Sequence, residues 1–135
     1  MLAVDAGAFA GMIGHAYDCY PEEMCGLLAG SAAGGRATMF YPCRNTTRSG
    51  RVFEIHGLDY QRAEDDADER GLELMAIVHS HTHTEPYPSP TDLAVAEGLG
   101  PWFRWVIVSL KRDAPETRSY RIADGVIAAE QVTVG

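Results

Sequence analysis

Two apolar runs limit most strongly the folds that this chain can adopt. Residues 72–78 (LELMAIV) and 104–110 (RWVIVSL) are almost entirely apolar. A strand that is buried on both faces is a continuous apolar run, whereas a strand with one face in water alternates. We therefore expect two central strands of one sheet, with helices packed on both faces. The 135 residues, of which 46% are hydrophobic and 22% charged, suit a single globular domain over residues 1–135.

The spacing of apolar and turn-forming residues predicts the remaining elements. A first helix is expected between Asp5, a suitable N-cap, and Pro21, which stops it. Its apolar positions at helical spacing are Phe9, Met12, Ile13, Ala16, Tyr17 and Tyr20. Further helices are expected over 58–70 and 91–98, and strands over 24–29, 36–43, 51–55, 116–123 and 125–134, the last two joined by a turn at Asp124-Gly125. The predicted fold class is therefore α/β or α+β, with a mixed sheet flanked by helices.

The charge and the cysteine count narrow the function classes. A net charge of −8 repels phosphate backbones, so nucleic-acid binding is not expected. The three cysteines, Cys19, Cys25 and Cys43, include no closely spaced pair, which argues against a disulfide framework and for a reducing compartment. The first residues lack the basic and apolar parts of a signal peptide, and no stretch is long enough to span a membrane. We therefore expect a cytoplasmic protein that does not bind membranes.

The segment from His79 to Asp92, HSHTHTEPYPSPTD, contains the candidate chemistry. His79 and His81 end a predicted strand, and residues two apart on a strand project to the same side. Two imidazoles so placed form half of a zinc site, and a catalytic zinc needs a third protein ligand and one open position. Asp92 can supply that ligand if the loop folds back over the strand end. Ser89 and Pro90 are also typical of an ordinary helix start, with Ser89 as N-cap, and the two interpretations are compatible.

The full pattern of this segment is more specific than the histidine pair alone. His-x-His, seven further residues and Ser-x-x-Asp, following a buried strand, resemble the signature of the JAMM metallopeptidases, also called MPN-plus domains. That family also has a glutamate in a Pro-x-Glu context that enters its first strand. Pro21-Glu22-Glu23 matches this context, with Glu23 at the position of the glutamate. The resemblance covers nearly the whole chain and implies the JAMM/MPN fold, which is cytidine-deaminase-like.

The resemblance also implies a role for each matched residue. His79, His81 and Asp92 would hold one Zn²⁺ ion, with a catalytic water in the open fourth position. Glu23 would be the general base toward that water, and Ser89 would donate a hydrogen bond to the oxyanion. The implied activity is zinc-dependent hydrolysis of an amide bond, without a covalent intermediate.

Within that family, this short chain is most similar to small bacterial members that act on sulfur-carrier proteins. Those carriers are small, ubiquitin-like and end in Gly-Gly. The resemblance implies hydrolysis of the amide bond after the Gly-Gly, with release of a cysteine built on the carrier. Two other activities stay open, namely trimming of a carrier precursor and isopeptidase removal of a ubiquitin-like modifier. A metal-free scaffold is the non-enzymatic alternative, although such domains typically lack one or more ligands.

Three further residues near the predicted centre could modulate it. His83 could be a spare ligand, Cys25 a nearby thiol and Tyr87 a substrate contact. The structural interpretations are an exposed loop histidine for His83 and a small buried thiol for Cys25. Zinc deamination is a different enzymatic reading, and it is excluded because the chain has no H-x-E followed by P-C-x-x-C.

Overall fold

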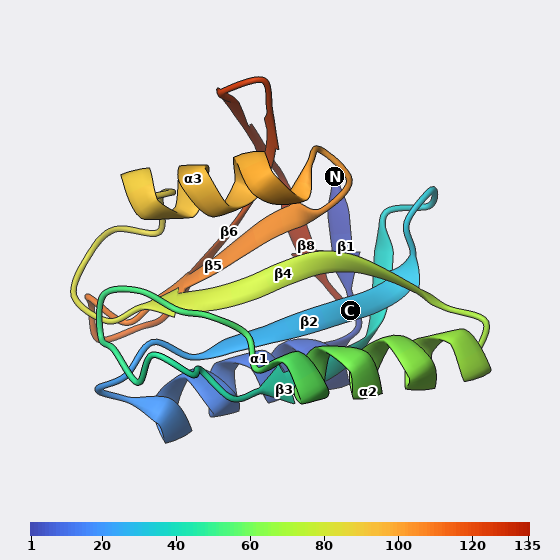
Figure 1. Cartoon of the computed structure of the whole chain (residues 1–135), viewed down its shortest axis with the longest axis horizontal. Helices are drawn as coiled ribbons and strands as arrows, with labels where there is room; N and C mark the ends of the chain where they lie inside the picture. The colour runs from blue at the N-terminus through green and yellow to red at the C-terminus, as the bar shows by residue number, and fades with distance from the viewer.

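The structure, a computed structural model, describes residues 1–135 and consists of one mixed sheet with helices on both faces (Figure 1). The helices are α1 (Ala6–Cys19), α2 (Gly57–Glu69) and α3 (Pro90–Leu99). The strands are β1 (Leu2–Val4), β2 (Cys25–Ser31), β3 (Arg36–Cys43), β4 (Glu73–His81), β5 (Arg104–Ser109), β6 (Glu116–Ala123), β7 (Val126–Glu130) and β8 (Val132–Val134). The predicted fold class, a mixed sheet flanked by helices, is confirmed.

The sheet curls until its two edges meet. Its strand order is β7-β6-β5-β4-β2-β3-β1-β8, so β7 and β8 lie at opposite ends. Only Gln131 separates these two strands in the chain, and one residue cannot cross a flat sheet of eight strands. The Leu2 backbone N–H donates to the Gln131 carbonyl at 2.8 Å, which extends the pairing of β1 with β8 to the linking residue. Arg104 of β5 donates to the Glu130 carboxylate nearby, also at 2.8 Å.

The two apolar runs form the central strands, as predicted. All six residues of β5 are buried, and so is β4 from Met75 to His81. Because side chains alternate, Val78 packs in the core beneath α1, whereas Ile77 packs in the core beneath α2 and α3. The two histidines have the same parity as Ile77 and therefore project toward α2 and α3.

The connection from β4 to β5 places a helix start beside the end of β4. These two strands are parallel, with His81 opposite Ser109, so the chain must return over one face of the sheet, and α3 makes that crossover. Ser89 is the N-cap of α3 and Pro90 is its first residue, which confirms the predicted helix start. The first turn of α3 therefore lies next to the carboxyl end of β4.

One strand prediction was wrong, one was incomplete and one strand was missed. The strand expected over 51–55 does not form, and only Ile55 makes an isolated bridge, to Asn45. The Asn45 side chain instead bonds the backbone groups of Val52 and Glu54 that a neighbouring strand would use. The single strand expected over 125–134 is divided into β7 and β8, and β1 was not predicted at all.

The predictions for the first helix were partly confirmed, and the predicted turn of the last hairpin was fully confirmed. Tyr17 and Tyr20, expected on the apolar face of the first helix, are 49% and 48% exposed. Asp5 is the N-cap residue of α1, but its carboxylate pairs with Arg36 and makes no cap hydrogen bond. The predicted turn at Asp124 and Gly125 is confirmed, and both residues have the positive φ of a tight hairpin. No helix is both long and apolar enough to cross a membrane.

Candidate metal centre

Four side chains from three separate segments converge on one point beneath α3. They are Glu23, His79, His81 and Asp92, and one candidate ligand atom from each lies within 4.8 Å of all the others. All four residues are buried, with at most 5% of their surface exposed. The structure thus brings together four of the five residues named from the sequence, and their individual roles remain predictions.

Three of the four atoms have the spacing of metal ligands. The Nε2 atoms of His79 and His81 are 3.2 Å apart, and each lies 3.1 Å from Oδ2 of Asp92. A tetrahedral metal with bonds of about 2.0–2.1 Å holds its ligands about 3.3 Å from one another. The triangle of two nitrogens and one oxygen therefore fits one face of such a coordination shell. The cluster could hold a metal ion.

The pairing of β2 with β4 explains how Glu23 reaches the histidines. The strands are antiparallel with Cys25 opposite His79, so the residues before β2 lie beside the end of β4. The Met24 N–H donates to Ser80 Oγ at 2.7 Å, and the Ser80 N–H donates to the Met24 carbonyl at 3.1 Å. This pairing places Glu23 next to the two histidines.

The Glu23 carboxylate faces the centre without a hydrogen-bond partner on its inner oxygen. Oε1 lies 3.9 Å from His79 Nε2 and makes no hydrogen bond, although it is fully buried. Burial raises the pKa of Glu23 to about 7, because a charge without water is costly. A buried and unpaired carboxylate is rare in purely structural positions. It is the arrangement expected of a group that exchanges protons.

The histidine rings present their Nε2 atoms to the centre for different reasons. His81 donates from Nδ1 to the Glu85 carbonyl at 2.8 Å, which leaves the Nε2 lone pair free to bind a metal. His79 Nδ1 has no partner, and its ring is instead stacked on Phe53 with centroids 4.4 Å apart. Complete burial lowers the pKa of His79, so this imidazole is neutral and has a lone pair to donate.

Asp92 and Ser89 fix each other at the start of α3. The Asp92 N–H donates to Ser89 Oγ at 3.1 Å, and the Ser89 N–H donates to Asp92 Oδ2 at 2.9 Å. Burial alone would raise the pKa of Asp92, but the close imidazoles of His79 and His81 and the Ser89 N–H lower it well below its usual value. The carboxylate is therefore charged and rigidly aimed. Ser89 Oγ accepts in this capping box, so its own O–H proton is free to be donated elsewhere.

The comparison with known protein families agrees with the motif. The profile of the family described as prokaryotic homologs of the JAB domain matches residues 5–123. The chain belongs to this family. The resemblance to JAMM/MPN domains noted from the sequence is therefore confirmed.

Curated relatives and solved structures extend this result. The CysO-cysteine peptidases of Mycobacterium tuberculosis and Mycobacterium bovis are 38% identical to this JAB-domain chain over 138 residues, covering 99% of it and 91% of each relative. A solution structure of a Desulfitobacterium hafniense protein has a TM-score of 0.89 at 26% identity, and the match covers 100% of this chain and 93% of that one. A JAB1/MPN domain protein from Archaeoglobus fulgidus has a TM-score of 0.64 at 19% identity over 98% of both chains, which shows the shared fold.

Three residues near the motif of this JAB domain do not join the cluster. His83 is exposed, with its ring edge-on to Tyr20. Cys25 is buried, and burial strongly raises the pKa of its thiol, which makes it an inert packing residue. Tyr87 is 55% exposed and stands edge-on to Tyr120. The interpretations of His83 as an exposed loop residue and Cys25 as a buried thiol are therefore confirmed.

Two contacts at the centre were not predicted from the sequence. Phe53 stacks on His79, and the backbone of Glu85 orients His81. A stacked phenylalanine leaves no spacing signal, because it comes from a loop far from the motif. A backbone carbonyl leaves no signal in residue types at all.

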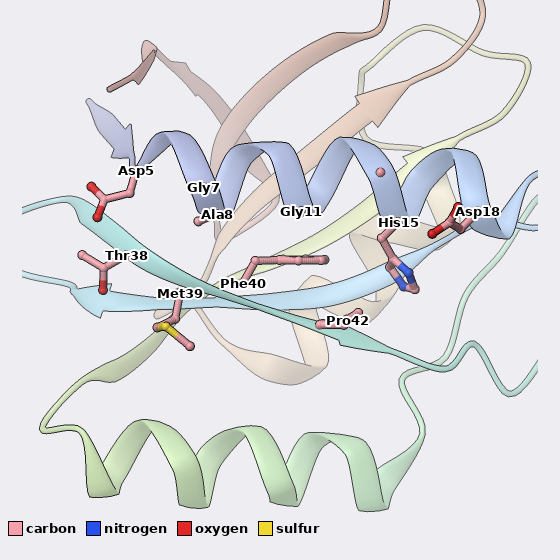
Figure 2. Close-up of a pocket in the computed structure, with 11 residues that line it drawn as sticks. Asp5, Gly7, Ala8, Gly11, His15, Asp18, Thr38, Met39, Phe40 and Pro42 are labelled. Carbon is pink, nitrogen blue, oxygen red and sulfur yellow. The ribbon is translucent and has the colours of Figure 1, made fainter.

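Two surface grooves of the molecule lie away from the cluster. One runs between α1 and β3, over Gly11 and Phe40, with Asp5 and Asp18 near its ends (Figure 2). The other lies between α3 and the β6–β7 turn. Neither groove is lined by any of the four cluster residues. The chemistry of this domain is therefore expected at the buried cluster and not in either groove.

Proposed function

We propose that this JAB domain is a zinc-dependent peptidase. In this proposal it hydrolyses the amide bond after the C-terminal Gly-Gly of a small ubiquitin-like sulfur-carrier protein and releases cysteine. The observation that carries the proposal is the buried triangle of two imidazole nitrogens and one carboxylate oxygen beside the unpartnered Glu23 carboxylate. A purely structural cluster would not leave a buried carboxylate oxygen without a partner.

Zinc is the metal that suits this donor set. Two imidazoles and one carboxylate are typical zinc ligands, and three protein ligands leave the open position of a catalytic site. His79, His81 and Asp92 would hold the ion, at the atoms that already form the triangle. When bound, zinc supplies Lewis acidity, which polarises a carbonyl and makes water more acidic.

The residues of this chain would perform the proton transfers. Glu23 accepts the proton of the attacking water on its free Oε1 and then delivers it to the nitrogen of the leaving amine. Its raised pKa of about 7 suits a group that must both accept and donate near neutral pH. Ser89 donates its O–H to the carbonyl oxygen as negative charge develops there.

The relatives and the burial of the site support a carrier protein as the substrate. The mycobacterial relatives are CysO-cysteine peptidases, which supports a carrier protein with a C-terminal cysteine as substrate. The four cluster residues are almost fully buried, so only a slender chain can reach them. Two glycines before the scissile bond meet that requirement because they have no side chains. Such a tail would bind in an extended conformation and use backbone hydrogen bonds.

Cleavage of defined carriers tests this function. Zinc-loaded protein is incubated with a ubiquitin-like carrier extended after Gly-Gly by cysteine, by a longer peptide, or by a lysine-linked isopeptide. Mass spectrometry then measures what is released. The proposal predicts loss of the single cysteine at the highest rate, with no release by the Glu23→Gln variant. Faster cleavage of the longer extension or of the isopeptide would instead support precursor trimming or isopeptidase activity, and no cleavage of any carrier would refute the proposal.

A further inference from the structure

The proposed general base stands on a segment without regular structure. Glu23 lies after α1 has ended at Cys19 and before β2 begins at Cys25. Its inner carboxylate oxygen has no hydrogen bond that would aim it. The direction of this side chain therefore depends on what holds the Glu23 backbone.

One loop, residues 45–54, holds the backbone of Glu23 on both sides. The Glu23 N–H donates to the Ser49 carbonyl at 2.7 Å. The Asn45 side chain donates from Nδ2 to the Glu23 carbonyl at 3.0 Å. Both hydrogen-bonding groups of the Glu23 backbone are thus satisfied by this loop and not by the sheet.

The Asn45 side chain also fixes the conformation of the 45–54 loop that bonds the Glu23 backbone. Its Nδ2 donates a second hydrogen bond, to the Val52 carbonyl at 3.1 Å. Its Oδ1 accepts from the N–H of Thr47 at 3.0 Å, from the hydroxyl of Thr47 at 2.6 Å and from the N–H of Glu54 at 3.1 Å. Both donors and the acceptor of one half-buried amide are therefore occupied, and the loop is folded around this side chain.

The same loop also contacts the ring of one histidine of the cluster and the residue next to the other. Thr82, the residue after His81, donates from Oγ1 to the Gly50 carbonyl at 3.1 Å. The Phe53 ring stacks on His79 with centroids 4.4 Å apart. A single loop thus contacts the backbone of the proposed base, the residue next to one histidine and the ring of the other.

We infer that Asn45 is a positioning residue that aims Glu23 at the reacting water. The inference rests on the proposed function and adds a residue to it. An amide is required at this position because the Glu23 carbonyl accepts, while Thr47 and Glu54 donate. A carboxylate at position 45 would keep the acceptor but would oppose the Glu23 carbonyl with a second acceptor. A misplacement of about 1 Å at a reacting group lowers the rate about 100-fold.

The Asn45→Asp variant tests this inference through a split between kcat and KM. With the carrier ending in Gly-Gly-Cys and zinc-loaded protein, kcat is expected to fall about 100-fold, while KM and bound zinc stay at the wild-type level. Thr46→Val is the matched control, because Thr46 lies in the same loop and its hydroxyl bonds only the Glu54 carbonyl, at 3.4 Å. Wild-type kcat in Asn45→Asp, or an equal loss in Thr46→Val, would overturn the inference.

Amide hydrogen exchange provides a readout that does not require activity. The Glu23 N–H should exchange about 10-fold faster in Asn45→Asp and in the uncharged Asn45→Ala, the factor that corresponds to one lost hydrogen bond. It should be unchanged in Thr46→Val. Unchanged exchange in both Asn45 variants would overturn the inference. If wild-type protein cleaved no carrier, the proposed function would fail, and the exchange rates would still decide whether Asn45 holds Glu23.

Discussion

Replacing Ser89 should separate a stability role from a catalytic role. Ser89 Oγ accepts the Asp92 N–H at 3.1 Å as the N-cap of α3. Replacing such a cap by alanine costs about 1 kcal/mol, whereas glycine costs only a few tenths. For a chain of 135 residues, a loss of about 1 kcal/mol lowers Tm by about 3 °C. Ser89→Ala should therefore be measurably less stable, and Ser89→Gly nearly as stable as wild type.

The loss of kcat should rank the Ser89 variants differently from the loss of stability. If the hydroxyl stabilises the oxyanion, its removal lowers kcat about 10²–10³-fold. Alanine and glycine both lack it, so both variants should lose activity equally, and Ser89→Thr should retain both stability and activity. Bound zinc should stay constant, because the Ser89 backbone N–H still fixes Asp92 Oδ2.

Thermal unfolding and carrier cleavage, measured on the same preparations, check the Ser89 prediction. Wild-type kcat in Ser89→Gly would refute the oxyanion role. A Tm of Ser89→Gly as low as that of Ser89→Ala would refute the cap argument. The two failures are independent, so each half of the reasoning can be rejected alone.

Three more substitutions test the cluster and its surroundings. His81→Ala should lose both zinc and activity, because it removes one of three ligands, and metal analysis with the cleavage assay measures both. Glu23→Gln should keep zinc and lose turnover, so wild-type turnover would exclude it as base. Asp59→Asn should be less stable than wild type at neutral pH, because hydrogen bonds from Arg44 lower the folded-state pKa of Asp59 to about 2. The unfolded-state pKa of Asp59 is about 3.9, so the stability difference between wild type and Asp59→Asn should shrink as pH falls from about 4 toward 2. Urea midpoints of both proteins across this range measure that difference. A difference that stayed constant with pH would contradict the ion-pair argument.

The parts of the site that could be predicted from sequence are those with a local pattern. The period of two along a strand predicted that His79 and His81 share a side, and their Nε2 atoms are 3.2 Å apart. The Ser89-Pro90 start predicted the rigid turn that presents Asp92. Glu23 was different, because its place depends on the register between β2 and β4. Only the family resemblance pointed to it.

The parts that could not be predicted depend on contacts between distant segments. β1 has three residues and is held by pairing with β3 and β8, so no local period marks it. Residues 51–55 have the composition of a strand, but the Asn45 amide binds their backbone groups and makes a loop. That loop supplies the Phe53 ring that stacks on His79 and the Asn45 amide that donates to the Glu23 carbonyl. The segment that the sequence did not predict to be a loop is therefore also the one that contacts His79 and Glu23.

Anomalous diffraction at the zinc edge tests the central claim most directly. Crystals of the wild-type protein grown with zinc should show one strong peak within about 2.0–2.2 Å of Nε2 of His79, Nε2 of His81 and a carboxylate oxygen of Asp92. A metal-free scaffold would show no peak there. A peak at another site, or an empty cluster in the presence of zinc, would contradict the assignment of these three residues and the peptidase mechanism built on them.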